Sequence, residues 1–186
     1  MKFTISSSSN DRIDEKYKKS AKNLLNYLVS LENSELCWGS GSSSIMGLCY
    51  DAFSKSGKNI YGYTSSKYID DIENLPLAKH RVFDTTFDLK KNIFNDADVV
   101  ICLPGGTGTI SEFFAYLEEI RSNDIDKLLV LYDENHHFKS TVDLINDLVE
   151  RDFNSDTIHS YYEVAHDVDE FGDILSRYAK KKGKSK

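Results

Sequence analysis

The sequence predicts an α/β fold, a doubly wound parallel sheet with helices on both faces, and three observations lead to it. Short apolar runs alternate with helical patterns along the chain, which is typical of right-handed βαβ crossovers. The segment Ala97–Leu103 (ADVVICL) is rich in apolar residues, as in a strand that is buried on both faces. Two glycine-rich clusters each follow a predicted strand directly, where parallel sheets bind ligands.

The strands and helices follow one another in a regular order. We expect strands at Lys2–Ile5, Glu35–Trp38, Asn59–Thr64, Arg81–Thr85, Ala97–Leu103, Lys127–Tyr132 and Tyr161–Ala165. We expect helices at about 11–30, 45–53, 90–95, 110–117, 140–149 and 168–178. The first helix carries apolar residues at the spacing of an amphipathic stripe. Gly57 is placed to end the second helix, and Ser140 is placed to cap the fifth.

The 186 residues suit one domain, which we place at 1–179, with a basic tail at 180–186 that we expect to be disordered. No apolar run is long enough for a membrane helix, and the N-terminus turns polar at Ser6, which excludes a secretory signal. The three cysteines form no CxxC pair and no zinc spacing. We therefore expect reduced, structural cysteines in a cytoplasmic protein that needs no membrane.

The net charge of −7, from 23 basic and 30 acidic residues, argues against a general nucleic-acid binder. Such a protein needs a basic face that displaces counterions from phosphates. The charge does not exclude a small phosphorylated ligand, because backbone N–H groups and one or two local cations are enough to hold one.

The segment Pro104–Glu112 (PGGTGTISE) is the strongest candidate for a binding site. Three glycines in four residues let the backbone turn tightly and approach a ligand. The following helix directs its free N–H groups toward this loop, which favours an anion such as phosphate. The loop is neither a Walker A motif nor GxGxxG. A glycine-rich turn that binds no ligand is the alternative.

Glu112 lies near the start of the helix that follows the loop. A carboxylate beside a phosphate site suits contacts to a sugar, to a catalytic water or to a developing cation. It could equally be an acid that completes the helix cap. The residues alone leave these two interpretations open.

PGGTGTISE resembles the PGGxGTxxE signature of the Lonely Guy (LOG) family, the cytokinin-activating phosphoribohydrolases that are often labelled lysine decarboxylase-like. Two looser motifs agree with it. The loop Ile5–Ser8 is similar to the small-residue loop of the family, and Gly39–Gly47 is similar to its GGGxxGxMG stretch. The resemblance spans roughly residues 2–175.

The resemblance implies a Rossmann-like homodimer that hydrolyses the N-glycosidic bond of a nucleoside 5′-monophosphate, such as AMP or N6-modified AMP, without cofactor or metal. It implies Glu112 and Lys90 as the catalytic residues. It further implies that the residues around the nucleotide are Ser7, Gly39, Gly41, Met46, Gly105, Gly106, Thr107, Gly108, Thr109 and Lys91. A non-catalytic nucleotide- or phosphometabolite-binding protein, or a cofactor carrier of the same fold, is the alternative.

The chain departs from the family pattern in two places. The catalytic arginine of the family stands in an Arg-Lys pair, whereas this chain has Lys90-Lys91 there, or Leu89 at the arginine if no gap is allowed. Lysine keeps the charge but loses the planar fork of donors. Arg81 or Arg121 could supply a guanidinium instead. The second departure is that serines replace two glycines, at positions 40 and 44.

Two further features favour an ordinary structural role. The pair His136-His137 lies in a polar loop between a strand and a helix, where we expect solvated side chains rather than a metal site. Trp38 ends a strand beside Gly39, and we expect it in the core rather than at the ligand pocket.

Overall fold

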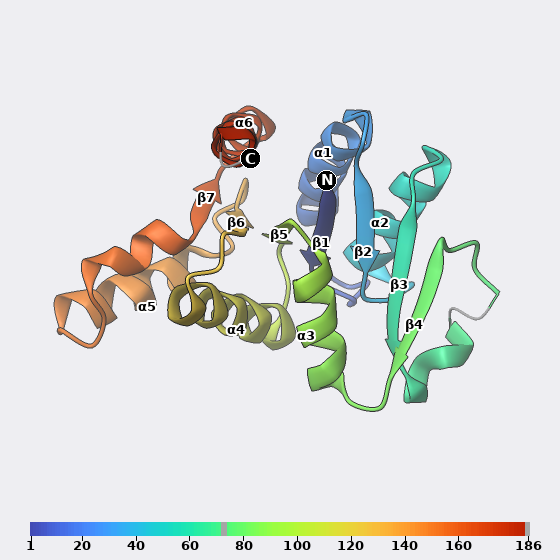
Figure 1. The fold of residues 1–186 in the computed structure, drawn as a ribbon, viewed down its shortest axis with the longest axis horizontal. Coiled ribbons are helices and arrows are strands. Elements are labelled where there is room, and N and C mark those ends of the chain that lie inside the picture. The colour runs from blue at the N-terminus through green and yellow to red at the C-terminus, as the bar shows by residue number, and fades with distance from the viewer. Residues whose placement is uncertain (72–73, 185–186) are drawn as a thin grey trace.

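The structure is a computed structural model that describes residues 1–71 and 74–184 (Figure 1). Within these residues, seven parallel strands form one sheet in the order β4-β3-β2-β1-β5-β6-β7. The strands are β1 (Lys2–Ser6), β2 (Glu35–Trp38), β3 (Ile60–Ser65), β4 (Lys79–Phe83), β5 (Val99–Cys102), β6 (Leu128–Tyr132) and β7 (Glu163–Ala165). The α-helices are α1 (Glu15–Ser30), α2 (Ser44–Lys55), α3 (Thr86–Asp96), α4 (Thr107–Asn123), α5 (Lys139–Glu150) and α6 (Val168–Lys184).

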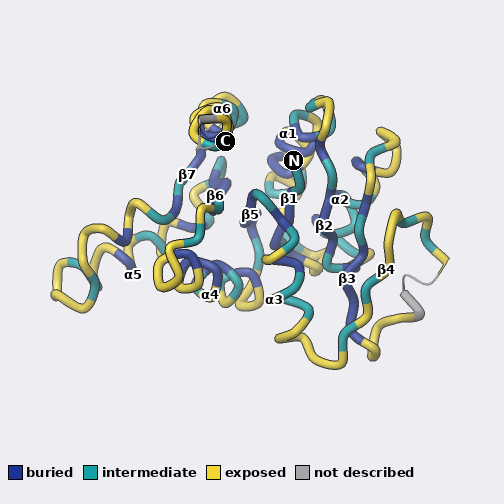
Figure 2. Tube along the Cα trace, viewed as in Figure 1, coloured by how far each residue is buried: buried dark blue, intermediate teal, exposed yellow. Residues whose placement is uncertain are grey.

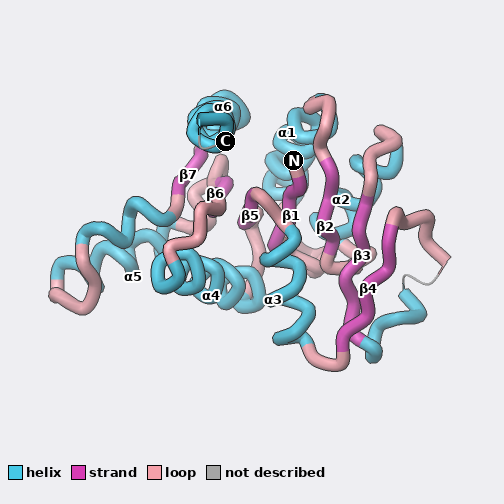
Figure 3. Tube along the Cα trace, in the orientation of Figure 1, coloured by secondary structure: helices cyan, strands magenta, loops and turns pink. Residues whose placement is uncertain are grey.

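Helices cover both faces of this sheet (Figure 3), which confirms the predicted doubly wound fold. Helices α1, α2 and α6 share one buried cluster, in which Leu24, Ile45 and Phe171 are fully buried. Helices α3, α4 and α5 contribute to a second cluster, in which Phe113 and Ile145 are buried. In Figure 2 the inner strands β1, β2, β5 and β6 are mostly buried, whereas the edge strand β4 and the outer turns of the helices are exposed. The apolar surface that these two layers remove from water is the main stabilising contribution to the fold.

The strand order reverses between β1 and β5. From β1 the chain adds β2, β3 and β4 on one side, then returns to place β5, β6 and β7 on the other side. Ser6 at the end of β1 lies opposite Cys102 at the end of β5, and the Leu103 N–H donates to the Ser6 carbonyl at 2.8 Å. The loops that follow these strands leave in different directions, which creates a crevice at the carboxyl edge of the sheet.

Helix α1 begins at Glu15, later than the expected start near Asp11. The Asp14 side chain caps it by accepting the Lys16 N–H at 2.9 Å. The Asp11 carboxylate instead accepts the Ser44 N–H, at 2.7 Å. Residues 7–14 therefore form a loop across the carboxyl edge of the sheet. The hydrophobic periodicity of the sequence could not predict this later start of α1, because Ser44, the partner of Asp11, is distant in sequence.

Helix α6 continues through Lys184, so residues 180–184 are helical where a disordered tail was expected. Residues 185 and 186 of that tail lie outside the described residues. Tyr178 anchors the helix, because its hydroxyl lies 3.1 Å from the Asp98 carbonyl and 3.2 Å from the Asp126 carbonyl. Lysine is a good helix former, so once the helix is anchored the basic segment extends it at little cost. Two 3₁₀ segments, Ser66–Asp71 and Asp156–Tyr161, were not predicted.

The expectations for Trp38 and the cysteines agree with the structure. Trp38 is 3% exposed, and its indole N–H donates to the Met46 carbonyl at 3.0 Å. All three cysteines are buried and free. Gly57 follows α2 with a φ of +65°, the left-handed conformation expected at a helix end. None of the described helices has the length and apolar character to cross a membrane.

Two serines adopt backbone conformations that favour glycine. Ser40 has a φ of 63° and Ser44 a φ of 53°, and the family pattern has glycine at both positions. A side chain in this left-handed region costs about 1–2 kcal/mol. The Ser44 hydroxyl is also buried without a hydrogen-bond partner among the described residues. The loop before α2 therefore stores strain.

We expect Ser44→Gly to raise the free energy of unfolding by about 1 kcal/mol, because the relief of strain exceeds the entropy that glycine adds to the unfolded chain. Urea unfolding curves measure this. Ser54→Gly is the matched control, since Ser54 lies on the exposed face of the same helix, and we expect it to lose about 0.5 kcal/mol. If the Ser44→Gly protein were no more stable than the Ser54→Gly control, the inference that Ser44 is strained would be wrong.

Candidate active site

Two adjoining cavities open at the carboxyl edge of the sheet. The glutamate cavity, of about 220 Å³, is lined by Ser6, Gly39, Met46, Leu89, Lys90, Glu112 and Tyr116 among others. The glycine-loop cavity, of about 380 Å³, is lined by Asn10, Tyr17, Gly105, Gly106, Thr107 and His137 among others. Ser7, Ser9, Gly108 and Thr109 line both cavities. One ligand can therefore reach from the glycine loop to the glutamate.

A larger hollow, of about 710 Å³, lies at the opposite, amino-terminal edge of the sheet. Its lining includes Lys127 and Leu128 at the start of β6, and Tyr178 on α6. We place the candidate site at the smaller cavities, because ligands of doubly wound folds bind at the carboxyl ends of the strands, where the strand order reverses.

The glycine loop is packed closely against the loop that follows β1. A Cβ atom on Gly105 would lie 2.1 Å from the Thr109 hydroxyl and 3.1 Å from the backbone carbon of Ser7. Only glycine fits there. Gly106 is the N-cap residue of α4 and makes no side-chain cap. The N–H groups of the first turn of α4 have no partner within the helix, and together with the helix dipole they favour an anion.

Ser7 supplies a second donor at the same place. Its hydroxyl oxygen is buried and has no hydrogen-bond partner among the described residues, while the residue lines both cavities. A buried polar group without a partner is costly. A ligand oxygen between the two cavities would satisfy it.

Glu112 lies in the second turn of α4, as the sixth residue of the helix. The interpretation as a cap acid is therefore wrong, because the effect of the dipole is concentrated in the first turn. Its carboxylate accepts a hydrogen bond from the Ser6 hydroxyl, and its Oε1 atom lies 3.4 Å from Lys90 Nζ. These contacts aim the carboxylate into the glutamate cavity, where its side chain is 23% exposed.

Two buried side chains near Glu112 are kept in their neutral forms. Burial raises the pKa of the Cys102 thiol and of the Tyr116 hydroxyl, and the negative charge of Glu112 is the next cause for both. Both groups therefore stay neutral near pH 7. Lys90 is the cation that the structure places directly beside the carboxylate.

Lys90 and Leu89 are both candidates for the position of the family arginine, and both line the glutamate cavity. Lys90 forms the ion pair with Glu112, which favours it over Leu89. Lys91 is exposed on α3 and is not among the residues that line either cavity. Lys90 therefore lines the candidate site, whereas Lys91, which we expected near the nucleotide, does not.

The two arginines that could replace the missing guanidinium are engaged elsewhere. Arg81 on β4 pairs with Asp96 at the end of α3. Arg121 makes a bidentate contact with Glu118 on the exposed surface of α4, at 2.8 and 2.9 Å. Neither lines the cavity at Glu112.

The loop after β2 supplies the third wall of the site. The terminal methyl of Met46 would lie 3.5 Å from a Cβ on Gly39 and 2.7 Å from one on Gly41. Met46 and Gly39 line the glutamate cavity, whereas Gly41 lies behind Met46 and lines neither cavity. Gly41 therefore acts through the position of Met46.

His137 is a site residue that the sequence analysis missed, because solvated histidines were expected in this loop. Its ring nitrogen Nε2 lies 2.9 Å from the Gly105 carbonyl oxygen, and the ring packs edge-on against Tyr17 at 5.5 Å. It lines the glycine-loop cavity. The sequence did contain one signal for His137, which is its place in the loop directly after β6. Because β6 lies beside β5 and is parallel to it, both strands end at the same edge of the sheet.

In this α/β protein, a glycine loop whose neighbouring helix N–H groups favour an anion lies beside a carboxylate that Ser6 and Lys90 orient. The family model described as "Possible lysine decarboxylase" matches residues 46–175. The chain therefore belongs to this family, which includes the LOG proteins, and the resemblance drawn from PGGTGTISE is confirmed.

The chain is similar to curated proteins and solved structures of this fold. It is 27% identical over 164 residues to the cytokinin riboside 5′-monophosphate phosphoribohydrolase LOG3 of Arabidopsis thaliana, with 88% of this chain and 76% of the relative covered. The molybdenum cofactor binding protein of Rippkaea orientalis superposes with a TM-score of 0.66 at 15% identity, over 95% of each chain. The molybdenum cofactor carrier protein of Chlamydomonas reinhardtii gives 0.66 at 15%, over 96% and 98%. At such identities the two structures establish the fold alone.

We expect Gly105→Ala to lower the free energy of unfolding by about 1–3 kcal/mol, the usual cost of forcing an atom into packed structure. Thermal and urea unfolding measure it. Gly106→Ala is the control, because a Cβ there meets nothing within 4 Å, and we expect a change below about 1 kcal/mol. Equal stability of the two variants would show that the close approach of the loops is not required.

Proposed function

We propose that this protein hydrolyses the N-glycosidic bond of a nucleoside 5′-monophosphate, AMP or an N6-modified AMP, to the free base and ribose 5-phosphate. The observation that carries the proposal is the position of Glu112. Its carboxylate is oriented by Ser6 and Lys90 inside a cavity that adjoins the glycine loop. The names of the curated relatives support the same reaction.

The 5′-phosphate would lie on the glycine loop. The free N–H groups at the start of α4 suit phosphate oxygens, as does the Ser7 hydroxyl, which has no partner among the described residues. Because Ser7, Gly108 and Thr109 line both cavities, a ribose attached to that phosphate would extend toward Glu112. Met46 and Gly39 would then border the ribose or the base.

Glu112 would act on the anomeric carbon. When the bond between C1′ and the base nitrogen breaks, its electron pair leaves with the base, and the ribosyl ring gains positive charge. A carboxylate beside C1′ stabilises that charge or orients the attacking water, as carboxylates do in glycoside hydrolysis. The water oxygen then bonds to C1′, and the protons of the water end on the new hydroxyl and on the base nitrogen.

Ser6 and Lys90 would keep the carboxylate ready for this step. The Ser6 hydroxyl donates to one carboxylate oxygen, and Lys90 faces the other. Preorganised contacts of this kind need no rearrangement as charge develops in the transition state. Lys90 is a point charge without the donor fork of arginine, so it fixes the geometry less strictly.

We expect purified protein to release ribose 5-phosphate from AMP or from N6-isopentenyl-AMP, and Glu112→Gln to lower kcat/KM by about 100-fold or more, because the charge is lost where it acts on the transition state. Chromatography of the base and an assay of ribose 5-phosphate measure both. Glu118→Gln is the control, since Glu118 lies on the exposed side of the same helix. No release from any purine or pyrimidine monophosphate by folded protein would contradict the proposal.

A non-catalytic nucleotide- or cofactor-binding protein is the second candidate. The lysine in place of the family arginine favours it, as do structural neighbours whose titles name molybdenum cofactor binding and carrier proteins. As a nucleotide-binding protein, it requires that AMP raises the melting temperature without turnover. Turnover that Glu112→Gln removes would exclude this second candidate. If AMP produced no turnover and no thermal shift, both the hydrolase and the nucleotide-binding protein would be contradicted.

We expect Lys90→Ala to lower kcat/KM by about tenfold or more, because the cation paired with Glu112 is removed, and Lys90→Arg to keep or raise the activity. Lys91→Ala is the matched control, because its side chain is exposed on the same helix and lines neither cavity. Steady-state kinetics on the best substrate measure kcat/KM for each variant. If Lys90→Ala and Lys91→Ala had the same effect, the role of Lys90 would be refuted.

A further inference from the structure

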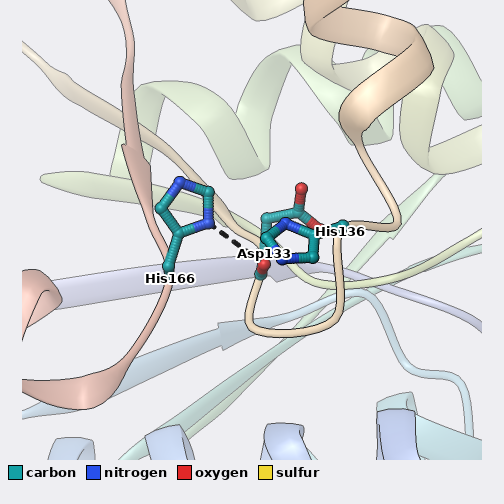
Figure 4. Close-up of side chains that lie close together, drawn as sticks. All are labelled: Asp133, His136 and His166. Atoms are coloured by element: carbon teal, nitrogen blue, oxygen red, sulfur yellow. Dashed lines mark hydrogen bonds between the residues drawn. The ribbon is translucent and has the colours of Figure 1, made fainter.

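A second cluster of ligand-type side chains lies at the ends of β6 and β7, apart from the residues that line the two cavities. It consists of Asp133, His136 and His166 (Figure 4). One potential ligand atom of each residue lies within 4.8 Å of the others. Asp133 follows β6, His136 lies in the turn after it, and His166 follows β7. Two neighbouring parallel strands thus bring together residues that are 33 positions apart.

Asp133 is the buried member of the cluster, with 2% of its surface exposed. Its Oδ1 atom accepts the Phe138 N–H at 3.0 Å. In the described part of the chain, no lysine or arginine forms an ion pair with this carboxylate, and no hydrogen bond reaches its Oδ2 atom. A buried carboxylate is costly unless a cation compensates it. The geometry leaves one carboxylate oxygen for such a cation.

The two histidines are held beside this carboxylate. The rings of His136 and His166 lie with their centroids 5.6 Å apart. The Nδ1 atom of His166 makes a weak contact, 3.3 Å, with the Asp133 backbone carbonyl (Figure 4). Because this contact is long, the ring can turn a nitrogen toward a metal ion at little cost. Each neutral imidazole then offers a lone pair.

The backbone around the cluster is fixed by its own hydrogen bonds. The Asp133 N–H donates to the Ala165 carbonyl at 2.7 Å, which joins the ends of the two strands. The His166 N–H donates to Glu170 on α6 at 2.8 Å. His136 has a φ of 55°, a left-handed conformation that costs free energy in a residue other than glycine. The turn that places His136 near Asp133 is therefore held against that strain.

We propose that Asp133, His136 and His166 bind a divalent transition-metal ion such as Zn²⁺. One carboxylate oxygen and two imidazole nitrogens are a donor set that zinc and cobalt accept readily, whereas calcium and magnesium prefer oxygen ligands alone. Three protein ligands leave a coordination position for water or for an additional group. The positive charge of the ion would compensate the negative charge of the buried Asp133 carboxylate.

Metal titration of the tag-free protein tests this proposal. After treatment with a chelator and its removal, the protein is titrated with Co²⁺, followed by visible absorption, and with Zn²⁺, followed by calorimetry. We expect one ion per chain, a cobalt spectrum of low coordination number, and a melting temperature that rises with Zn²⁺. Addition of Mg²⁺ should not displace the cobalt spectrum.

Four variants assign the ligands. We expect His136→Ala and His166→Ala each to weaken binding by about tenfold or more, while His80→Ala and His159→Ala, at two exposed histidines elsewhere, retain it. Because both ligand histidines are exposed, their replacement should not disturb the core, and circular dichroism should show that the variants are folded. The absence of binding at micromolar to millimolar Zn²⁺, or binding that the ligand variants leave unchanged, would overturn the proposal.

Discussion

The pairing of β1 with β5 is the constraint on which the candidate site depends. The two strands are hydrogen-bonded with Ser6 opposite Cys102, and the Ser8 N–H extends the contact to the Pro104 carbonyl at 3.1 Å. The serine loop and the glycine loop therefore begin side by side, at the point where the strand order reverses. The Ser6–Glu112 contact, the close approach of Gly105 to Ser7 and both cavities follow from this pairing.

Local geometry governs the electrostatics of the site more than the net charge does. The chain carries a net charge of −7, yet the backbone N–H groups at the start of α4 favour an anion in direct contact with them. Glu112 is kept away from these donors because it lies in the second turn of α4, where Ser6 and Lys90 bind it. A phosphate on the glycine loop and the Glu112 carboxylate would thus not compete for the same donors.

The sequence was sufficient to predict the sheet, both helical layers and the glycine loop, because hydrophobic periodicity and glycine placement are local signals. Contacts between distant segments could not be predicted in the same way. Asp11 binds Ser44 instead of starting α1, and Arg81 pairs with Asp96 instead of approaching Glu112. His136 and His137 look identical in sequence, but the turn after β6 sends one toward His166 and the other toward Gly105.

The proposed function requires one ligand to span the two cavities, with its phosphate on the glycine loop and its ribose at Glu112. A crystal structure of the Glu112→Gln variant with bound AMP tests this most directly. We expect the phosphate to bind the N–H groups at the start of α4 and the Ser7 hydroxyl, with C1′ beside residue 112. A nucleotide bound at another edge of the sheet, or with its phosphate away from the glycine loop, would contradict it.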